Sequence, residues 1–390
     1  MNLIHGMDNA TNIRAVHVIA GLGTQYGGPS LYVPSLCAAL ASVGCDATIL
    51  TISGADSVAG PGINAFAPDF ANVPIFGALR SSSGMRAALG QATRNADVVH
   101  AHGLWLMPNV YAGRAASRAR KPLIVTPHGS LAPAALQRSK IRKKVFWRWL
   151  QRPAYLDAFA WHATSAAESA DIAAFGVTAP VATIPVGIEI PNEVARHDPV
   201  KSRRKLLFLS RLHPHKNLDL LIDVWRRLAP RHLNWDLIIA GSGDDRHVRS
   251  FIDRAAAIEH SRITFAGHVG PQDKAMLLRE SDLFVLPSRS ESFGIVVAEA
   301  LASGLPAVVT RGAPWELLDS KGCGWWVEES RDALELALDK AMRCSVFERK
   351  AMGLRGRSWM EQEFGWQTIA QRMVALYREA RRVNSIEVRA

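Results

Sequence analysis

The chain has 390 residues, 48% of them hydrophobic and 21% charged, and its formal net charge at pH 7 is +11. This length exceeds what one typical hydrophobic core occupies, so we expect two globular domains. No uncharged apolar run reaches the length of a membrane span, and the first residues lack the basic and apolar regions of a secretory signal, so we expect neither.

The positive charge favours anionic partners. No nucleic-acid-binding motif is present, which excludes nucleic acid and leaves phosphate-bearing substrates and acidic lipid surfaces. The cysteines lack the spacing of a metal or redox site, which indicates buried thiols in a reducing compartment. They are Cys37, Cys45, Cys323 and Cys344.

The first half of the chain alternates short apolar runs with stretches of helical spacing, a pattern that predicts a parallel sheet covered by helices. The predicted strands are 14–20, 47–52, 97–100, 123–126, 161–165 and 181–186.

A glycine-rich turn, which includes Gly27 and Gly28, follows the first strand and leads into a predicted helix at 31–43. Such a turn lets the backbone approach a phosphate closely. The same residues could also form only a flexible turn.

Two histidines, His102 and His128, lie just beyond predicted strands. Open parallel sheets bind ligands at the carboxyl ends of their strands, so both are site candidates, with His128 preferred. A lone histidine is more often a satisfied structural residue. The neighbouring Trp105 could stack on a sugar ring or fill the core.

Residues 138–152 hold seven basic residues and no acidic one, interleaved with six apolar residues. This composition is typical of an amphipathic segment lying on an anionic bilayer. A partly buried helix with a basic, solvated face explains it about equally well.

A polar run at 193–204 is the best linker, and a second series of strands and helices follows it. We therefore expect an N-terminal domain at 1–195, a C-terminal domain at 203–363 and a terminal helical region at 364–390. The predicted strands of the second half are 205–210, 236–240, 263–265, 283–286, 307–310 and 324–327, and its predicted helices are 218–228, 331–342 and 364–382.

Arg211 and Lys216 lie in the loop between the first strand and the first helix of this second series. Two cations beside a helix N-terminus can clamp a diphosphate and stabilise the charge that builds on it when a bond to it breaks. Alternatively, the two residues are solvated cations on the surface.

Glu291 and Glu299 belong to a strand–loop–helix unit in which Glu291 occupies the loop and Glu299 the helix. The backbone NH groups of Phe293, Gly294 and Ile295 begin that helix and offer an anion site. Taken alone, this is also what an ordinary unit with solvated glutamates looks like.

Together these motifs resemble those of the retaining glycosyltransferases of family 4, which have the GT-B fold. The resemblance rests on E-x7-E at 291–299, R-x4-K-N at 211–217, T-P-H-G at 126–129 and Gly-Gly at 27–28, and it extends over nearly the whole chain. It implies two Rossmann-like α/β domains facing a cleft, with a C-terminal helix that crosses back to the N-terminal domain.

The resemblance also implies roles for single residues. Arg211 and Lys216 would hold the donor diphosphate, Glu291 the donor sugar hydroxyls and Glu299 the ribose, while His128 would lie beside the donor sugar. The remaining donor contacts would come from Gly27, Gly28, Gly241, His268, Val269, Phe293, Gly294 and Ile295.

The activity implied is transfer of a sugar from a nucleotide diphosphate sugar to an acceptor hydroxyl with retention of anomeric configuration. The family works without a bound metal, and Asp244-Asp245 is the nearest approach to a metal-binding D-x-D motif here. With segment 138–152, the acceptor expected is a lipid-linked glycan of exopolysaccharide or O-antigen synthesis, at the inner face of the cytoplasmic membrane. A soluble acceptor, or a catalytically silent protein that binds a nucleotide sugar or a glycan, are the alternatives.

Overall fold

The structure, a computed structural model, describes residues 12–23, 28–54, 60–71, 73, 77–196, 198, 200, 202–258, 261–291 and 293–387. The chain divides into two compact units. Met1–Gly187 and Trp366–Ala390 form the N-terminal unit, and Ile188–Gly365 form the C-terminal unit. The last helix thus belongs to the N-terminal unit.

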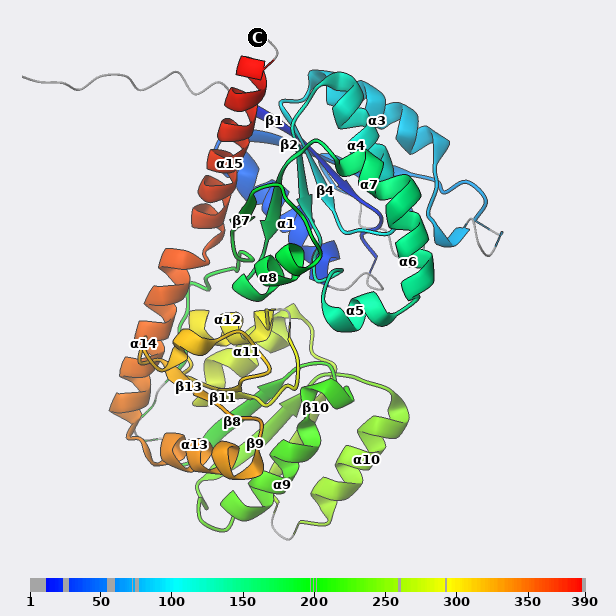
Figure 1. Cartoon of the computed structure of the whole chain (residues 1–390). Helices are drawn as coiled ribbons and strands as arrows, with labels where there is room; N and C mark the ends of the chain where they lie inside the picture. The colour runs from blue at the N-terminus through cyan, green and yellow to red at the C-terminus, as the bar shows by residue number, and fades with distance from the viewer. Residues whose placement is uncertain are drawn as a thin grey trace, which may run out of the picture. The chain divides into compact units, whose positions relative to one another are not determined.

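The N-terminal unit is built on a parallel sheet whose described strands follow the order β3-β2-β1-β4-β5-β6-β7 (Figure 1). The chain moves outward from β1 to β3 and then returns to the other side of β1. This reversal creates a switch point between β1 and β4, where the carboxyl ends of the strands leave a crevice. The strands are β1 (Ile13–Ile19), β2 (Cys45–Ile52), β3 (Ile63–Phe66), β4 (Val98–His102), β5 (Leu123–Thr126), β6 (Ala158–Ala163) and β7 (Val181–Thr183).

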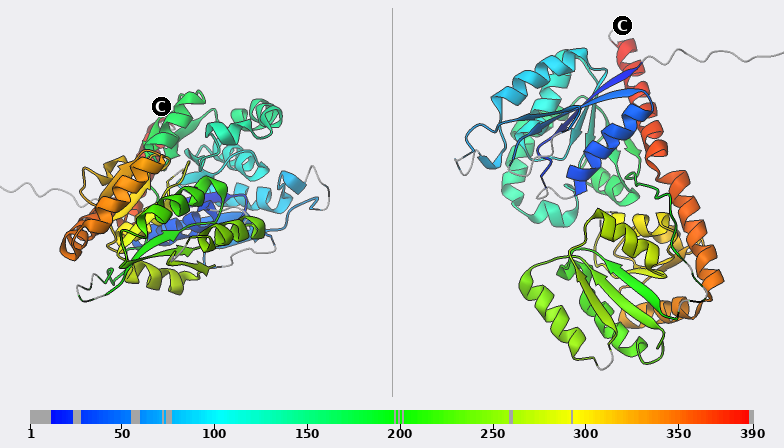
Figure 2. Two further views of the ribbon diagram at one scale, coloured as in Figure 1. Left: turned by 90° about the horizontal axis from the view of Figure 1, so that it is seen from below. Right: turned by 180° about the vertical axis from the view of Figure 1, so that it is seen from behind.

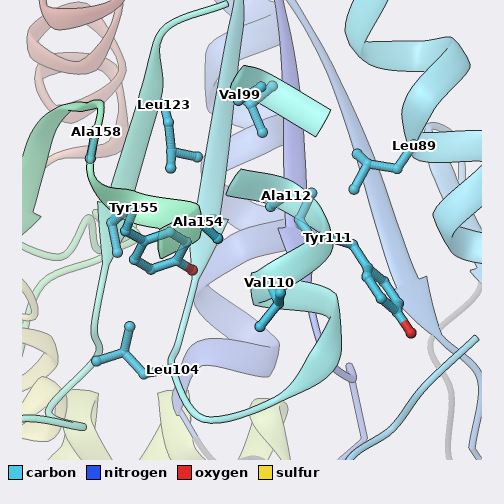
Figure 3. Close-up of a cluster of buried hydrophobic side chains, with 14 of the residues drawn as sticks. Leu89, Val99, Leu104, Val110, Tyr111, Ala112, Leu123, Ala154, Tyr155 and Ala158 are labelled. Carbon is cyan, nitrogen blue, oxygen red and sulfur yellow. The ribbon is translucent and has the colours of Figure 1, made fainter. Parts of the chain in front are cut away.

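Helices cover both faces of this sheet. One face packs against α3, α4 and α7 around a large apolar cluster that includes Leu89, Val99 and Val110 (Figure 3). The other face carries α1 and α15, which lie side by side (Figure 2, right). The helices of the unit are α1 (Gly28–Ser42), α3 (Ser83–Asn95), α4 (Met107–Ala119), α5 (Pro133–Gln137), α6 (Lys140–Phe146), α7 (Arg152–Tyr155), α8 (Ala166–Ala174) and α15 (Trp366–Glu387).

Strand alternation separates the polar residues of this sheet from its apolar ones. On β1, Val16 and Val18 belong to the apolar cluster under α3 and α4, so His17 between them faces α1 and α15. The same alternation turns His100 and His102 of β4 toward α15. A buried polar row therefore crosses an otherwise apolar sheet.

The C-terminal unit repeats the plan with a parallel sheet of order β10-β9-β8-β11-β12-β13 among its described strands (Figure 1). Its switch point lies between β8 and β11. The strands are β8 (Arg204–Leu209), β9 (Trp235–Ala240), β10 (Ile263–Gly267), β11 (Leu283–Leu286), β12 (Ala307–Thr310) and β13 (Gly324–Val327). The helices are α9 (Leu218–Leu228), α10 (Asp245–Ala256), α11 (Pro271–Glu280), α12 (Ile295–Ala302), α13 (Arg331–Arg343) and α14 (Val346–Glu363).

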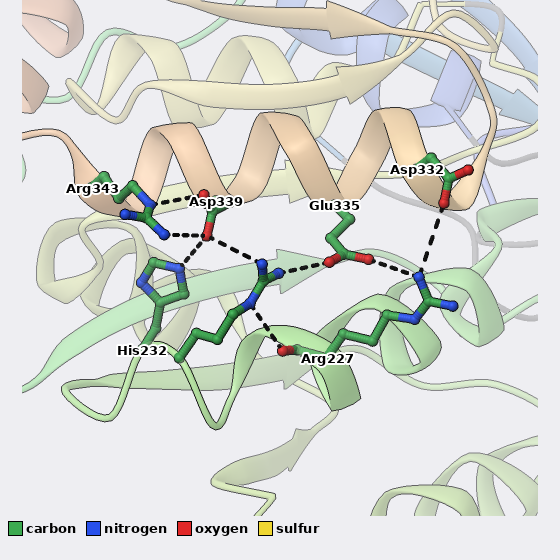
Figure 4. Close-up of polar contacts among 7 residues, drawn as sticks. Arg227, His232, Asp332, Glu335, Asp339 and Arg343 are labelled. Carbon is green, nitrogen blue, oxygen red and sulfur yellow. Dashed lines mark hydrogen bonds and ion pairs between the residues drawn. The ribbon is translucent and has the colours of Figure 1, made fainter.

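Ion pairs join α9 and the turn that follows it to α13 along their outer edges (Figure 4). Arg231 donates to Glu335 at 2.6 Å, and His232 lies 2.8 Å from Asp339. The side chain of Asp339 is only 19% exposed and also accepts from Arg343, which lowers the pKa of its carboxyl group. The network orients the two helices on one face of the sheet. Among the described residues, none of the helices combines the length and apolarity needed to cross a bilayer.

Candidate active site

The loops that follow β8 and β11 meet at the switch point of the C-terminal sheet. Lys216, at the end of the β8–α9 loop, forms an ion pair with Glu291 of the β11–α12 loop, and their side chains are only 15% and 11% exposed. Ser288 donates a second hydrogen bond to the same carboxylate oxygen, Oε1 of Glu291, at 2.8 Å. The structure therefore brings together one predicted cation and one predicted acid.

Further hydrogen bonds hold the two loops together. Asn217, which is 3% exposed, begins α9 in a left-handed conformation with φ of 55°. Its amide donates to Glu329 at 3.1 Å and accepts from Arg289 at 3.2 Å. The Arg289 backbone NH also donates to the His215 carbonyl at 2.8 Å. These contacts tie both loops together independently of the ion pair.

Arg211 occupies the same β8–α9 loop, but its side chain is exposed. Its carbonyl accepts from the backbone NH of His213 at 3.0 Å, so the loop is folded locally around it. Arg211 therefore offers a solvated guanidinium in the loop that also holds Lys216, and its role at the diphosphate stays a prediction.

Glu299 pairs with a different lysine. Its Oε1 lies 2.6 Å from Nζ of Lys274 on α11, and the two side chains are partly exposed. Both residues line a pocket of about 620 Å³, which Glu291 does not line. The other polar residues in the wall of this pocket are Glu189, Asn192, Glu193, Gln272, Arg279 and Ser303.

The side chain of Trp315 contacts the turn that begins α12. Gly294 has φ of 82°, and a Cβ there would lie 3.2 Å from Nε1 of Trp315. That nitrogen donates to the carbonyl of buried Phe293 at 2.7 Å, while Ile295 is exposed. The turn therefore requires glycine at 294, and whether its NH groups bind an anion stays a prediction.

Gly241 is required by the fold. Its φ is 136°, and a Cβ there would come within 1.8 Å of the Ser210 carbonyl oxygen. Its NH donates to the Gly267 carbonyl at 2.7 Å, which joins the loops after β9 and β10. His268 is exposed and Val269 partly exposed in the latter loop. Their proposed contact with the donor stays a prediction.

The described residues contain two features relevant to a metal. Asp244 accepts from the Arg246 backbone NH at 3.1 Å as the N-cap of α10, so it already has a structural role. His17, His100 and His102 lie close enough for one nitrogen of each to share an ion, with these atoms within 4.8 Å of one another. Their nitrogens, however, are engaged in hydrogen bonds with neighbouring groups.

In the N-terminal unit, His102 and His128 line a hollow of about 190 Å³ at the carboxyl ends of β1, β4 and β5. Nδ1 of His102 lies 3.0 Å from Nε2 of His128, and the rings are stacked. Asn109 also lines the hollow. Its amide donates to the His102 carbonyl, and among the described residues its buried Oδ1 has no partner. Two histidines and an asparagine therefore line this hollow.

A buried carboxylate supports the turn that carries His128. Glu168 of α8 is 6% exposed and accepts from the Gly129 NH at 2.6 Å. It also accepts from the NH and the hydroxyl of Thr164, each at 2.7 Å. These bonds hold His128 in its left-handed conformation, with φ of 53°. Burial lowers the pKa of His128 to about 4 despite this carboxylate, so its ring is neutral at pH 7.

Three N-terminal candidates remain, namely Gly28, Gly27 and Trp105. Gly28 is the first residue of α1, with open space where a Cβ would project. Gly27 lies outside the described residues. Trp105 packs against Trp147 and Phe175 and donates to the Ser130 carbonyl at 3.3 Å, so it serves the core.

Segment 138–152 has both a packed face and an exposed apolar face. Phe146 is buried and Trp147 packs against the apolar cluster of the N-terminal unit. On the outside, Ile141, Val145 and Trp149 are 80%, 55% and 70% exposed. The segment is α6 followed by one π-helical turn (Trp147–Gln151) and α7. The packed face fits the partly buried helix, and docking of the exposed face on a membrane stays a prediction.

Sequence reasoning missed several of these residues. Lys274 gave no motif because its partner lies on another helix, and Glu168 gave none because it binds the turn at Gly129, 39 residues away in the sequence. His17, His100 and His162 were not singled out. The alternating pair at 100 and 102 was a usable signal, because alternate strand residues share one face.

Comparison with known proteins agrees with this geometry. Residues 27–187 match the glycosyl transferase 4-like domain, and residues 189–359 match the glycosyl transferases group 1 family. An uncharacterized glycosyltransferase of Methanocaldococcus jannaschii is 30% identical over 179 residues, which are 45% of this chain and 45% of that one. The chain spans about half the length of several curated relatives that it matches.

A longer match is a GDP-mannose:cellobiosyl-diphosphopolyprenol alpha-mannosyltransferase of Xanthomonas oryzae, 26% identical over 296 residues, or 74% of this chain and 76% of that one. Among solved structures, Anabaena HepE in complex with UDP and glucose has a TM-score of 0.72 at 18% identity, covering 94% of this chain and 100% of that one. The last likeness concerns the fold alone. With both halves matched and two Rossmann-like units observed, the chain belongs to glycosyltransferase family 4 and has the GT-B fold.

Proposed function

We propose that this protein transfers a hexose from a nucleoside diphosphate sugar to an acceptor hydroxyl and retains the anomeric configuration of the sugar. The observation that carries the proposal is the nearly buried ion pair of Lys216 and Glu291 at the switch point of the C-terminal sheet. Opposite charges that are mostly removed from water add little net stability, whereas they equip a site for a charged substrate.

Lys216 and Glu291 can each form further hydrogen bonds while they remain paired. An ammonium group has three protons, so Lys216 can donate to Glu291 and still donate to a phosphate oxygen. Glu291 receives Lys216 and Ser288 on Oε1, and among the described residues its Oε2 has no donor. That oxygen can accept from a hydroxyl of the donor sugar.

Lys216 then stabilises the negative charge that develops on the leaving diphosphate, with Arg211 as a second, solvated cation. With these cations in place, the reaction needs no bound metal. The leaving phosphate helps to deprotonate the acceptor hydroxyl on the same face of the sugar, which gives retention. Glu299 exchanges its Lys274 partner for the ribose hydroxyls.

A lipid-linked glycan is the proposed acceptor. The Xanthomonas relative is named for a mannosyl transfer to a diphosphopolyprenol-linked sugar, and it aligns with three quarters of this chain. The exposed row Ile141, Val145 and Trp149, spaced four residues apart among basic side chains, suits the surface of an anionic bilayer. The enzyme would act as a peripheral protein on the inner face of the cytoplasmic membrane, in exopolysaccharide or lipopolysaccharide assembly.

Donor binding and chemistry can be tested directly. A thermal-shift screen with UDP, GDP and ADP identifies the base, and NMR of the product reads the anomeric configuration. Slow donor hydrolysis or transfer with the expected retention supports the proposal. Binding without turnover in any acceptor mixture favours a catalytically silent protein, and inversion at the anomeric carbon contradicts the retaining mechanism.

Membrane docking has its own test, which is flotation with vesicles of phosphatidylcholine alone or with added phosphatidylglycerol. We expect binding only to the anionic vesicles, and Trp149→Glu should weaken it because Trp149 is exposed. Leu336→Glu, at an exposed leucine of α13, is the matched control. Equal binding to both vesicle types, or no effect of Trp149→Glu, counts against this role.

A further inference from the structure

A continuous chain of hydrogen bonds crosses the N-terminal sheet beneath α15 and ends at the hollow. It connects strands β1, β4, β5 and β6 with one helix, and its side chains between the two ends are fully or almost fully buried. In order, its members are Ile184, His162, Thr126, His100, Tyr377, His17, His102 and His128.

The first half of the chain runs from Ile184, the residue after β7, to α15. Nε2 of His162 lies 2.8 Å from the Ile184 carbonyl oxygen, and its Nδ1 lies 2.8 Å from the Thr126 hydroxyl. That hydroxyl is 2.7 Å from Nε2 of His100. Nδ1 of His100 in turn lies 2.7 Å from the hydroxyl of Tyr377.

The second half runs from α15 to the hollow. The Tyr377 hydroxyl lies 3.3 Å from Nε2 of His17, and Nδ1 of His17 lies 2.9 Å from Nε2 of His102. Nδ1 of His102 is 3.0 Å from Nε2 of His128. Both ring nitrogens of each internal histidine are therefore used once.

The Ile184 carbonyl, at one end of the chain, determines which group donates in every hydrogen bond. A carbonyl oxygen can only accept, so the proton of His162 must be on Nε2, and Nδ1 of this neutral ring must accept from Thr126. The hydroxyl has one proton to give, so it accepts from Nε2 of His100. Repeating this argument through Tyr377 puts the proton of each following histidine on Nε2. The end of the chain is then His128 with its proton on Nε2 and a lone pair on Nδ1.

The argument requires neutral rings, and burial provides them. It lowers the pKa of His17 to about 3 and keeps those of His100 and His102 well below the usual histidine range. His162 and His128 are shifted in the same direction. At pH 7 all five are therefore neutral.

We propose that this chain, with Tyr377 of α15 as its central link, holds His128 in one tautomer whose Nδ1 accepts a hydrogen bond from a sugar hydroxyl in the hollow. The ligand part rests on the proposed function; the tautomer does not. His17, His100, His162, Thr126 and Tyr377 are positioning residues, because they act on the ligand only through His128.

The same chain of hydrogen bonds prevents His128 from acting as a general base. A proton taken up at Nδ1 could move along the chain by one step per bond, but it would stop at His162, because the Ile184 carbonyl cannot pass it on. At each position along the way the added proton would leave a buried positive charge, an imidazolium or a protonated hydroxyl, which burial disfavours. His128 thus acts as a fixed, neutral acceptor.

The test uses the full chain labelled with 15N only at histidine, with tautomers read from long-range 1H–15N NMR at pH 7 and His128 assigned with His128→Gln. We expect all five rings as Nε2–H forms. Tyr377→Phe and Thr126→Val each remove one hydroxyl link, so the Nδ1–H form should become detectable at His128. Thr126→Ser retains the hydroxyl and should restore the single form.

Tyr155→Phe is the matched control, because Tyr155 is buried in the same unit but outside the chain. It should leave the tautomers unchanged, and thermal melts should show that all variants are folded. Transfer by Tyr377→Phe should fall about three- to tenfold in kcat, the scale of one net hydrogen bond. Its affinity for nucleoside diphosphate should stay unchanged, because that ligand is proposed to bind the C-terminal unit.

The tautomer measurement decides the inference independently of catalysis. A mixture or an Nδ1–H ring at His128 in the unaltered protein overturns it, as does an unchanged tautomer in both Tyr377→Phe and Thr126→Val. A metal ion at one per chain by elemental analysis also overturns it, since ligation by His17 and His102 would break their shared bond. If the tautomer is as stated but the protein transfers no sugar, only the proposed function fails.

Discussion

The ammonium group of Lys216 and the carboxylate of Glu291 form an ion pair between two loops that are 75 residues apart in the sequence. Each loop follows a strand at the switch point of the C-terminal sheet, β8 for the lysine and β11 for the glutamate. The pair is positioned by backbone and side-chain hydrogen bonds of Asn217, Ser288 and Arg289. Its geometry therefore does not depend on the ion pair alone.

Removing the cation should affect chemistry more than folding. We expect Lys216→Ala to lower donor turnover about a hundredfold, because one donor aimed at developing negative charge has this scale of effect. Initial rates of nucleoside diphosphate release measure it. Lys321→Ala, which removes a surface ion pair with Glu363 in the same unit, should change the rate less than twofold. Equal rates for the two variants would contradict the assignment.

Glu299→Gln should weaken binding of the nucleoside diphosphate about tenfold, because the amide accepts less strongly from two ribose hydroxyls than a carboxylate. Isothermal titration measures the affinity. Lys274→Met separates this effect from loss of the ion pair, and it should bind at least as tightly as the unaltered protein, since it frees Glu299 from its partner. Weakening of the same size in both variants would assign the effect to the ion pair.

Gly241→Ala should destabilise the C-terminal unit by about 2 kcal/mol or more. The residue has φ of 136°, and a methyl group would overlap the Ser210 carbonyl. Urea unfolding gives the free energy. Gly90→Ala is the control within a helix, where a Cβ meets open space, and it should stabilise the protein by about 0.5–1 kcal/mol. Unchanged stability of Gly241→Ala would show that the loops can shift.

The free energy of unfolding should fall as the pH drops from 7 to 5. The buried histidines stay neutral in the folded protein, with pKa values of about 3 for His17 and about 4 for His128. Unfolded histidines take up protons below about pH 6.5, so acid favours unfolding, whereas above that pH these groups cause no change. For His17 alone the loss at pH 5 is about 2 kcal/mol.

Urea unfolding at a series of pH values measures this dependence. His247→Gln is the control and should leave it unaltered, because the side chain of His247 is half exposed and lies in the C-terminal unit, outside the buried histidines. A free energy that stays constant between pH 7 and 5 would mean that the histidines of the N-terminal unit are accessible to protons.

Much of the element pattern was predictable from local composition. The ranges expected for β5, β11, β12, β13 and α9 coincide with those observed. Continuous apolar runs bounded by turn residues leave little choice of position. In contrast, α14 was not predicted, since its 18 residues lack a strong apolar stripe. The predicted start of β6 was three residues late, because Ala158 and its neighbours carry a weak strand signal.

The sequence by itself determined the family, the two α/β units and the strand ends at which the candidate residues lie, because these follow from local apolar periodicity and from short motifs. Only the tertiary structure decided which charges meet. It paired Lys216 with Glu291 but Glu299 with Lys274, and it joined five histidines through Tyr377 of the last helix. Such contacts depend on how strands and helices distant in sequence pack together, and no local pattern encodes the distance between their side chains.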